Sequence, residues 1–189
     1  MDLLGPVYLG RVLRLCQFVF TVIAMGLALG IDLGLDHPHT TFVFAVAILT
    51  YVWIIPMWFA TLIRYYPAHV IFVGEVLMLI FWLCAMAISL LDYASKSCTV
   101  VNTVGDATYT ETDSKCEIGK ALAGFATVVW VFFLVTLALV VTFIVYPILS
   151  QVGLPALWTL VTDNAFYPGG VFCGEVYVKT HPPIDVIDE

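Results

Sequence analysis

Long apolar stretches alternate with short polar segments along the chain, and this pattern predicts a polytopic membrane protein. A helix needs roughly 20 apolar residues to cross the hydrocarbon core of a bilayer. Apolar stretches of at least that length cover residues 12–33, 40–63, 69–93 and 120–149. Because the backbone in lipid must satisfy its own hydrogen bonds, we expect an all-α fold in which residues 1–149 form a bundle of four antiparallel transmembrane helices.

The last segment, residues 150–189, is predicted to lie outside the bundle. Gly153 and Pro155 interrupt its apolar start, and too few residues follow for a fifth span. Residues 155–162, with Trp158, are typical of a short helix in the membrane interface. The remainder is expected to form a cytoplasmic tail.

Composition supports the membrane class. Hydrophobic residues make up 62% of the 189 residues, charged residues 11%, and the mean hydropathy is +1.03. Ordinary soluble domains are only about 45–50% apolar. The net charge of -7 comes mostly from residues 106–117 and from the last five residues, so it describes water-facing segments. An acidic surface argues against nucleic acid as a partner.

One carboxylate, Glu75, lies inside the third apolar stretch. A charge there costs several kcal/mol unless it is paired, protonated or turned toward protein. We therefore expect Glu75 to face the other helices as a polar anchor that hydrogen-bonds to them, and we expect Glu75→Gln to keep the fold. The alternative is a proton or cation path through Glu75, although such a path needs polar groups at several depths.

Three glycines, Gly26, Gly30 and Gly34, recur at four-residue spacing near the end of the first span. Small residues at this spacing let two helices approach closely in lipid. The stripe is interpreted as a packing face within the bundle or, alternatively, as the face of a homo-oligomer.

The polar loop at residues 94–119 contains Cys98 and Cys116. Two cysteines that frame a loop outside the bilayer most simply form a disulfide, which would constrain the loop by about 3 kcal/mol. The loop contains no histidine, so the pair is not interpreted as a metal site. The turn with Asp36, His37 and His39 is interpreted as a solvated turn, and no metal or other cofactor is expected.

Orientation is inferred from charge and from redox chemistry. Arg11 and Arg14 lie at the start of the first span, and basic residues favour the cytoplasmic side. A disulfide needs an oxidising compartment, which places the cysteine loop in the extracellular or lumenal space and both termini in the cytoplasm. Cys16 and Cys173 then face the cytoplasm, where each is a candidate acylation site or a plain thiol.

The chain resembles the MARVEL-domain membrane proteins, particularly the fungal members, over residues 7–149. The resemblance rests on span number, loop lengths and two patterns. The patterns are Glu75-Val76-Leu77 with Ile80-Phe81-Trp82, and Cys116 followed by Lys120-Ala121 and Trp130. It implies a role in membrane organisation or vesicle trafficking, at the plasma membrane or on secretory-pathway vesicles.

Three classes of function follow from these observations. The first is a non-enzymatic, self-associating scaffold whose partners are the lipid bilayer, including a sterol or another specific lipid, and further copies of the chain. The second is a small proton- or cation-conducting protein that uses Glu75. An enzyme is not expected, because the sequence has no Ser-His-Asp, HExxH or Cys-His grouping.

Overall fold

The computed structural model describes residues 4–31, 38–58, 68–104 and 107–151, together with Gly153 and Trp158. Within these residues, four helices are long and apolar enough to cross a membrane, which confirms the prediction of a helical, four-span membrane bundle. They are α1 (Leu4–Ile31), α2 (Pro38–Trp58), α4 (Ala68–Tyr93) and α5 (Ser114–Val140). The chain of α5 continues through a π-helical turn, η1 (Val141–Val145), into α6 (Tyr146–Gln151).

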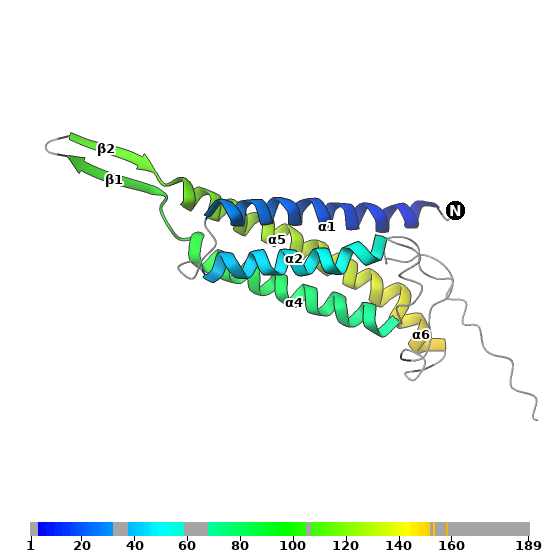
Figure 1. Ribbon diagram of the computed structural model, residues 1–189. Helices are drawn as coiled ribbons and strands as arrows, with labels where there is room; N and C mark the ends of the chain where they lie inside the picture. The colour runs from blue at the N-terminus through cyan, green and yellow to red at the C-terminus, as the bar shows by residue number, and fades with distance from the viewer. Residues whose placement is uncertain are drawn as a thin grey trace, which may run out of the picture.

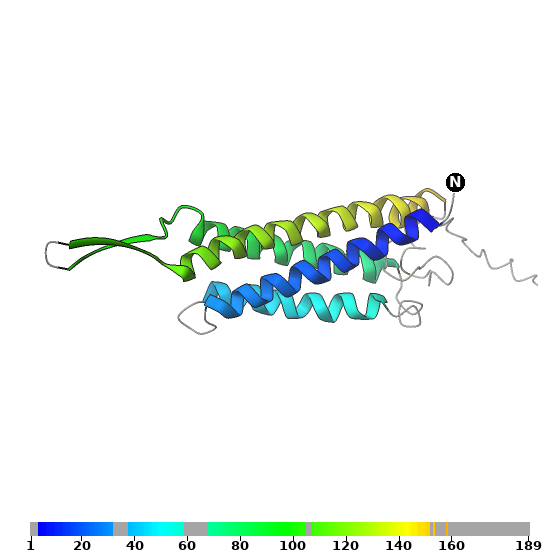
Figure 2. The same ribbon diagram turned by 90° about the horizontal axis from the view of Figure 1, so that it is seen from above.

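The four long helices lie side by side, and successive helices run in opposite directions (Figures 1 and 2). The start of α1 and the short helix α6 lie together at one end of the bundle, which we call the terminal end. A β-hairpin projects from the opposite end, which we call the hairpin end. This arrangement places the two ends of the described chain on the same side of the bundle.

Each helix is apolar on both its inner and its outer face. On α1, the small residues Ala24 and Ala28 are buried, and they join a core that includes Trp82 and Phe133. The outer face of the same helix carries large apolar side chains that are 42–52% exposed: Val12, Leu15, Val19, Val22 and Leu29. Such an extensive exposed apolar surface is unusual for a soluble monomer, whereas a lipid environment accommodates it.

Helix boundaries agree with the sequence prediction for the third span and differ for the others. The fourth span begins at Ser114 instead of residue 120, because Asp113 caps the helix by accepting a hydrogen bond from the Lys115 N–H at 3.0 Å. The first helix begins at Leu4 and therefore extends eight residues beyond the predicted start. Residues 59–63, predicted to complete the second span, lie outside the described residues.

The helix that starts at Ser114 passes Pro147 and continues to Gln151, two residues beyond the predicted end of the fourth span at residue 149. Proline has no N–H to donate to the preceding helical turn. The π-helical turn η1 lies directly before this position, and π turns accommodate such interruptions within longer helices.

The polar loop forms a β-hairpin, which the sequence analysis did not predict. Strands β1 (Thr99–Val104) and β2 (Ala107–Thr112) pair antiparallel, with Thr99 opposite Thr112. Strand β1 consists mostly of valine and threonine, and β2 contains three threonines and one tyrosine. These residues favour extended backbone. Their polar and apolar mixture had been interpreted only as a loop.

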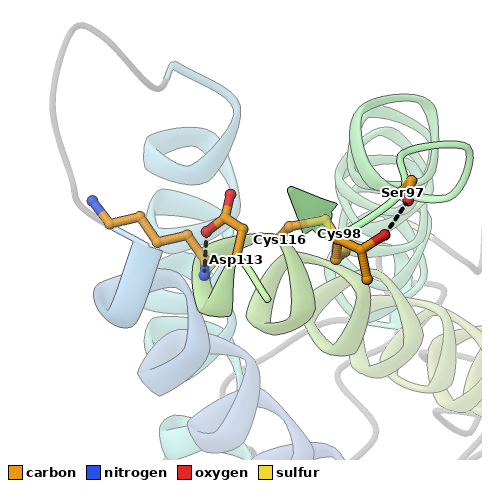
Figure 3. Close-up of a disulfide and its surroundings, with 6 residues drawn as sticks. Ser97, Cys98, Asp113 and Cys116 are labelled. Carbon is orange, nitrogen blue, oxygen red and sulfur yellow. Dashed lines mark hydrogen bonds between the residues drawn. A yellow bond between two sulfur atoms is a disulfide. The ribbon is translucent and has the colours of Figure 1, made fainter. Parts of the chain in front are cut away.

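The base of the hairpin is closed by the Cys98–Cys116 disulfide (Figure 3). The predicted pairing is therefore confirmed. The backbone N–H of Asp113 also donates a hydrogen bond of 2.8 Å to the carbonyl of Cys98. Because Cys116 lies in the first turn of α5, the disulfide joins the hairpin to the rigid end of a spanning helix.

Replacing both cysteines of this disulfide with serine is expected to lower the free energy of unfolding by about 3 kcal/mol, since the unfolded chain regains loop entropy. Unfolding in detergent, monitored by circular dichroism, would measure the change. The matched control is Cys84→Ala, because Cys84 is a free cysteine on the exposed face of α4. Equal stability of the two variants would contradict the prediction.

Candidate functional site

The intramembrane carboxylate lies in the interior of the bundle. Glu75 is on α4, and its side chain has no exposed surface. The structure thus places it toward the other helices, as the sequence analysis expected. What holds it there is a set of polar side chains from the three other spanning helices.

The principal partner of Glu75 is Arg14 of α1. The Arg14 Nη2 forms an ion pair and hydrogen bond with Glu75 Oε1, and the Arg14 side chain is also fully buried. From the sequence, Arg14 was interpreted only as a charge that reports orientation, and its pairing with Glu75 was not predicted. Its charge compensates that of the carboxylate, which offsets part of the cost of burying the two groups.

Three further side chains complete the group. Trp53 of α2 donates its Nε1–H to Glu75 Oε1 at 2.9 Å, and Thr136 of α5 donates its hydroxyl to Glu75 Oε2 at 2.9 Å. Gln17 of α1 accepts from Arg14 Nη1 at 2.9 Å and donates to Thr136 Oγ1 at 3.2 Å. These five residues, called the polar cluster below, join all four spanning helices.

The Thr136 hydroxyl also lies 3.0 Å from the carbonyl oxygen of Phe133. A hydroxyl has only one proton to donate, so the two acceptors compete for it. The Glu75 carboxylate is charged and is therefore the stronger acceptor. We therefore assign the hydrogen bond donated by the Thr136 hydroxyl to Glu75. The Thr136 oxygen can still accept a hydrogen bond from Gln17.

The polar cluster lies toward the terminal end of the bundle. Arg14 is four residues after Gly10, where the apolar part of α1 begins, and Glu75 is six residues after His69, where that of α4 begins. At about 1.5 Å of rise per residue, these intervals correspond to depths of about 6 and 9 Å. The cluster is thus inside the hydrocarbon region but not at its centre.

A glycine next to Glu75 makes room for the tryptophan. A Cβ atom at Gly74 would lie 2.0 Å from Cη2 of Trp53 and 2.3 Å from its Cζ2. The indole ring therefore lies directly against the backbone of α4, and this position brings its Nε1 to the carboxylate. Only glycine at position 74 permits this contact without displacing the ring.

A second buried hydrogen bond joins α2 and α4 outside the polar cluster. Trp82, which is fully buried, donates its Nε1–H to the Thr50 hydroxyl at 2.9 Å. The Thr50 hydroxyl in turn donates to the Val46 carbonyl at 2.8 Å within α2. Trp53 and Trp82 therefore each donate their indole N–H to a partner on the neighbouring helix.

The glycine stripe does not pack inside the bundle as a unit. Gly26 is exposed, and a Cβ atom there would meet nothing within 4 Å. Gly30 approaches only the Ile118 side chain, at 3.8 Å from the position of such a Cβ. Gly34 lies outside the described residues. The interpretation of the stripe as an internal packing face is therefore wrong for Gly26, which points away from the helices of the bundle.

None of the other predicted residues that the structure describes is a member of the polar cluster. Cys16 is partly buried in α1, whereas Cys173 lies outside the described residues. Trp158 is 60% exposed, and its ring centroid is 4.7 Å from that of His69 at the start of α4. His39 lies 3.4 Å from Asp92 across α2 and α4, while its sequence neighbours Asp36 and His37 are not described.

The polar cluster offers charge neutralisation and hydrogen bonding rather than a reactive group. Both oxygens of Glu75 accept hydrogen bonds, and its charge is matched by Arg14. Within the part of the chain that the structure describes, no group of three histidine, cysteine or acidic side chains could hold a metal ion. The geometry is that of a hydrogen-bonded network that holds the four spanning helices together.

No family model matches this chain, and no curated protein and no solved structure matches it either. The class of the protein rests on its structure: it is an integral membrane protein with four spanning helices and a disulfide-closed hairpin at one end.

Proposed function

We propose that this protein is a non-enzymatic organiser of membranes, a scaffold that associates with further copies of itself in the bilayer. The single observation that carries the proposal is that both oxygens of the intramembrane carboxylate are bound to side chains of the other spanning helices. Arg14, Trp53 and Thr136 occupy its oxygens. The chain then acts through its outer surface, as the resemblance to MARVEL-domain proteins implies.

Conduction through Glu75 is the alternative function. A carboxylate that passes protons or cations must be reached by water or by a chain of polar groups. Glu75 has no exposed surface and is paired with a guanidinium, so releasing it would leave two buried charges uncompensated. This pairing favours an anchoring role over a conducting one.

The exposed side of α1 is the surface we assign to self-association. Gly26 lies among large exposed side chains, with Val22 and Ile23 before it and Leu29 after it. A glycine between such side chains forms a notch in which the helix of another copy can approach the backbone. The other exposed apolar faces contact lipid, including a sterol or another specific lipid.

We place the hairpin end in the extracellular or lumenal space and both termini in the cytoplasm. With Arg14 buried in the polar cluster, the positive charge before the first span is reduced, and Lys96, Lys115 and Lys120 all lie toward the hairpin end. The Cys98–Cys116 disulfide, which needs an oxidising compartment, therefore carries the assignment. The plasma membrane and secretory-pathway vesicles satisfy it, and Cys16 then lies in the cytoplasmic half of the first span.

Reconstitution into liposomes tests the proposal. Electron microscopy is expected to show clustered particles, arrays or tubules, and single-molecule photobleaching is expected to show several copies per cluster. Gly26→Leu should reduce the number of copies per cluster, because it fills the notch on α1. The matched control is Gly124→Leu, since Gly124 on α5 is also exposed and open to 4 Å.

Scattered single particles in smooth vesicles would overturn the scaffold. A pH-gradient assay on the same liposomes addresses the alternative: proton flux that is abolished by Glu75→Gln, in a variant shown to be folded, would support conduction.

A further inference from the structure

A polar pocket of about 400 Å³ opens at the hairpin end of the bundle. It lies where α1 ends at Ile31, α2 begins near Thr40 and α4 ends at Tyr93, and the start of α5 closes its remaining side at Cys116. Because the apolar spans end here, the pocket is at the level of the lipid headgroups. Its volume is in the range of small-molecule sites.

One side chain in this pocket lacks the partner that its burial requires. Thr40 is 1% exposed and lines the pocket, and among the described residues its hydroxyl has no hydrogen-bond partner. A buried hydroxyl without a partner costs free energy. The hydroxyl oxygen itself is buried, so a ligand oxygen in the pocket would satisfy it once the Thr40 side chain turns toward the pocket.

The charges that line the pocket come in both signs. Lys96 and Lys115 supply two ammonium groups, and Asp92 and Asp113 supply two carboxylates. Each pair of opposite charges comes from one helix end: Asp92 and Lys96 from the end of α4, and Asp113 and Lys115 from the start of α5. A ligand of one sign would be attracted by half of these groups and repelled by the other half. A compact zwitterion matches both.

The aromatic content of the pocket distinguishes between zwitterions. Quaternary ammonium groups are recognised by cages of aromatic rings. Among the described lining residues, Tyr93 supplies one aromatic ring in addition to the imidazole of His39. The Lys96 Nζ already lies 5.5 Å from the centroid of the Tyr93 ring, so the described residues do not form an aromatic cage. Carboxylates instead suit a primary ammonium, which can donate three hydrogen bonds to them.

We propose that this pocket binds a phosphoethanolamine group, supplied by the headgroup of a phospholipid. The phosphate accepts from the Thr40 hydroxyl and pairs with Lys96 and Lys115, while the ammonium pairs with Asp92 and Asp113. The proposal does not depend on self-association, because the pocket lies within one copy of the chain.

Native mass spectrometry of the full chain tests the proposal with three lipids that share the same acyl chains: phosphatidylethanolamine, phosphatidylcholine and phosphatidylglycerol. We expect the first to bind at least several-fold more tightly than the others. Thr40→Val should weaken its binding about tenfold, as expected for losing one hydrogen bond to a charged group, whereas Thr40→Ser, which keeps the hydroxyl, should bind normally.

Charge variants test the two halves of the ligand separately. Lys96→Met should weaken binding of phosphatidylethanolamine, and its matched control is Lys120→Met, an exposed lysine on α5 that does not line the pocket. Asp92→Asn should reduce the preference for phosphatidylethanolamine over phosphatidylcholine. The intact disulfide and the unfolding temperature of each variant show that it is folded.

Competition with free glycerophosphoethanolamine distinguishes the source of the group. Failure of the free headgroup to displace bound lipid assigns the site to a membrane lipid, and displacement at equal concentration assigns it to the soluble group. Equal binding of all three lipids would overturn the proposal, as would unchanged binding of phosphatidylethanolamine by folded Thr40→Val and Lys96→Met.

Discussion

Replacing Arg14 with methionine is expected to lower the free energy of unfolding by about 3–5 kcal/mol, the cost of leaving one member of a buried ion pair without its partner. Methionine keeps much of the length of the side chain, so the lost charge dominates the effect. Glu75 would then be a buried carboxylate with Trp53 and Thr136 as its remaining donors. Unfolding in detergent, followed by circular dichroism, measures the change.

The reciprocal variant, Glu75→Gln, should cost a similar amount, because it leaves the Arg14 guanidinium buried and uncompensated. The double variant Arg14→Met with Glu75→Gln should recover most of the loss. It contains no buried charge, and the glutamine oxygen can still accept from Trp53 or Thr136. The difference between the double variant and the sum of the single variants gives the coupling energy of the pair.

Arg11→Met is the matched control for these measurements. Arg11 lies less than one turn before Arg14 on α1 and is exposed, so its loss should change stability by less than about 0.5 kcal/mol. If Arg14→Met and Arg11→Met cost the same, the ion pair does not stabilise the bundle.

This expected result for Glu75→Gln reverses the one drawn from the sequence alone. From the sequence, Glu75 was a lone carboxylate in an apolar span, and an amide could replace an anchor that only accepts hydrogen bonds. Its counter-charge was not recognised, because Arg14 lies close to the predicted start of the first span at residue 12. An arginine in that position is ordinarily interpreted as a signal of orientation.

A signal for the partner was nevertheless present in the sequence. Arg14, Gln17 and Thr21 recur at intervals of three and four residues, and the same stripe continues through Ala24 and Ala28. All five are buried. Polar residues that share one face of an otherwise apolar helix indicate a face turned toward protein, since lipid cannot satisfy their hydrogen bonds.

The outer faces of the helices could not be separated from the inner faces in the same way. In a soluble helix the contrast between polar and apolar positions identifies the buried side. In lipid both sides are apolar, so Gly26 could not be assigned to the inside or the outside from spacing. The number of spans and the bounds of the third span depend on hydropathy and were predicted. Contacts between helices, such as that of Trp53 with Glu75, depend on how each helix is rotated about its own axis, which hydropathy does not report.

Gly74→Ala is expected to destabilise the bundle by about 4 kcal/mol through its effect on Trp53. The new methyl group would lie 2.0 Å from the indole ring, and overpacking of this kind costs about 1–3 kcal/mol. Moving the ring also breaks its hydrogen bond to Glu75, and a hydrogen bond to a charged group contributes about 1.5–3 kcal/mol. Thermal and denaturant unfolding in detergent would measure the sum.

The matched control is Gly124→Ala on α5. A Cβ atom there meets nothing within 4 Å, so the substitution should be neutral or should stabilise the helix by up to about 1 kcal/mol. A second test combines Gly74→Ala with Trp53→Leu. The smaller side chain removes the clash, so Gly74→Ala should cost much less in that background than in the native chain. An equal cost in both backgrounds would show that the glycine is required for a reason other than the position of Trp53, and would remove the link between Gly74 and the polar cluster.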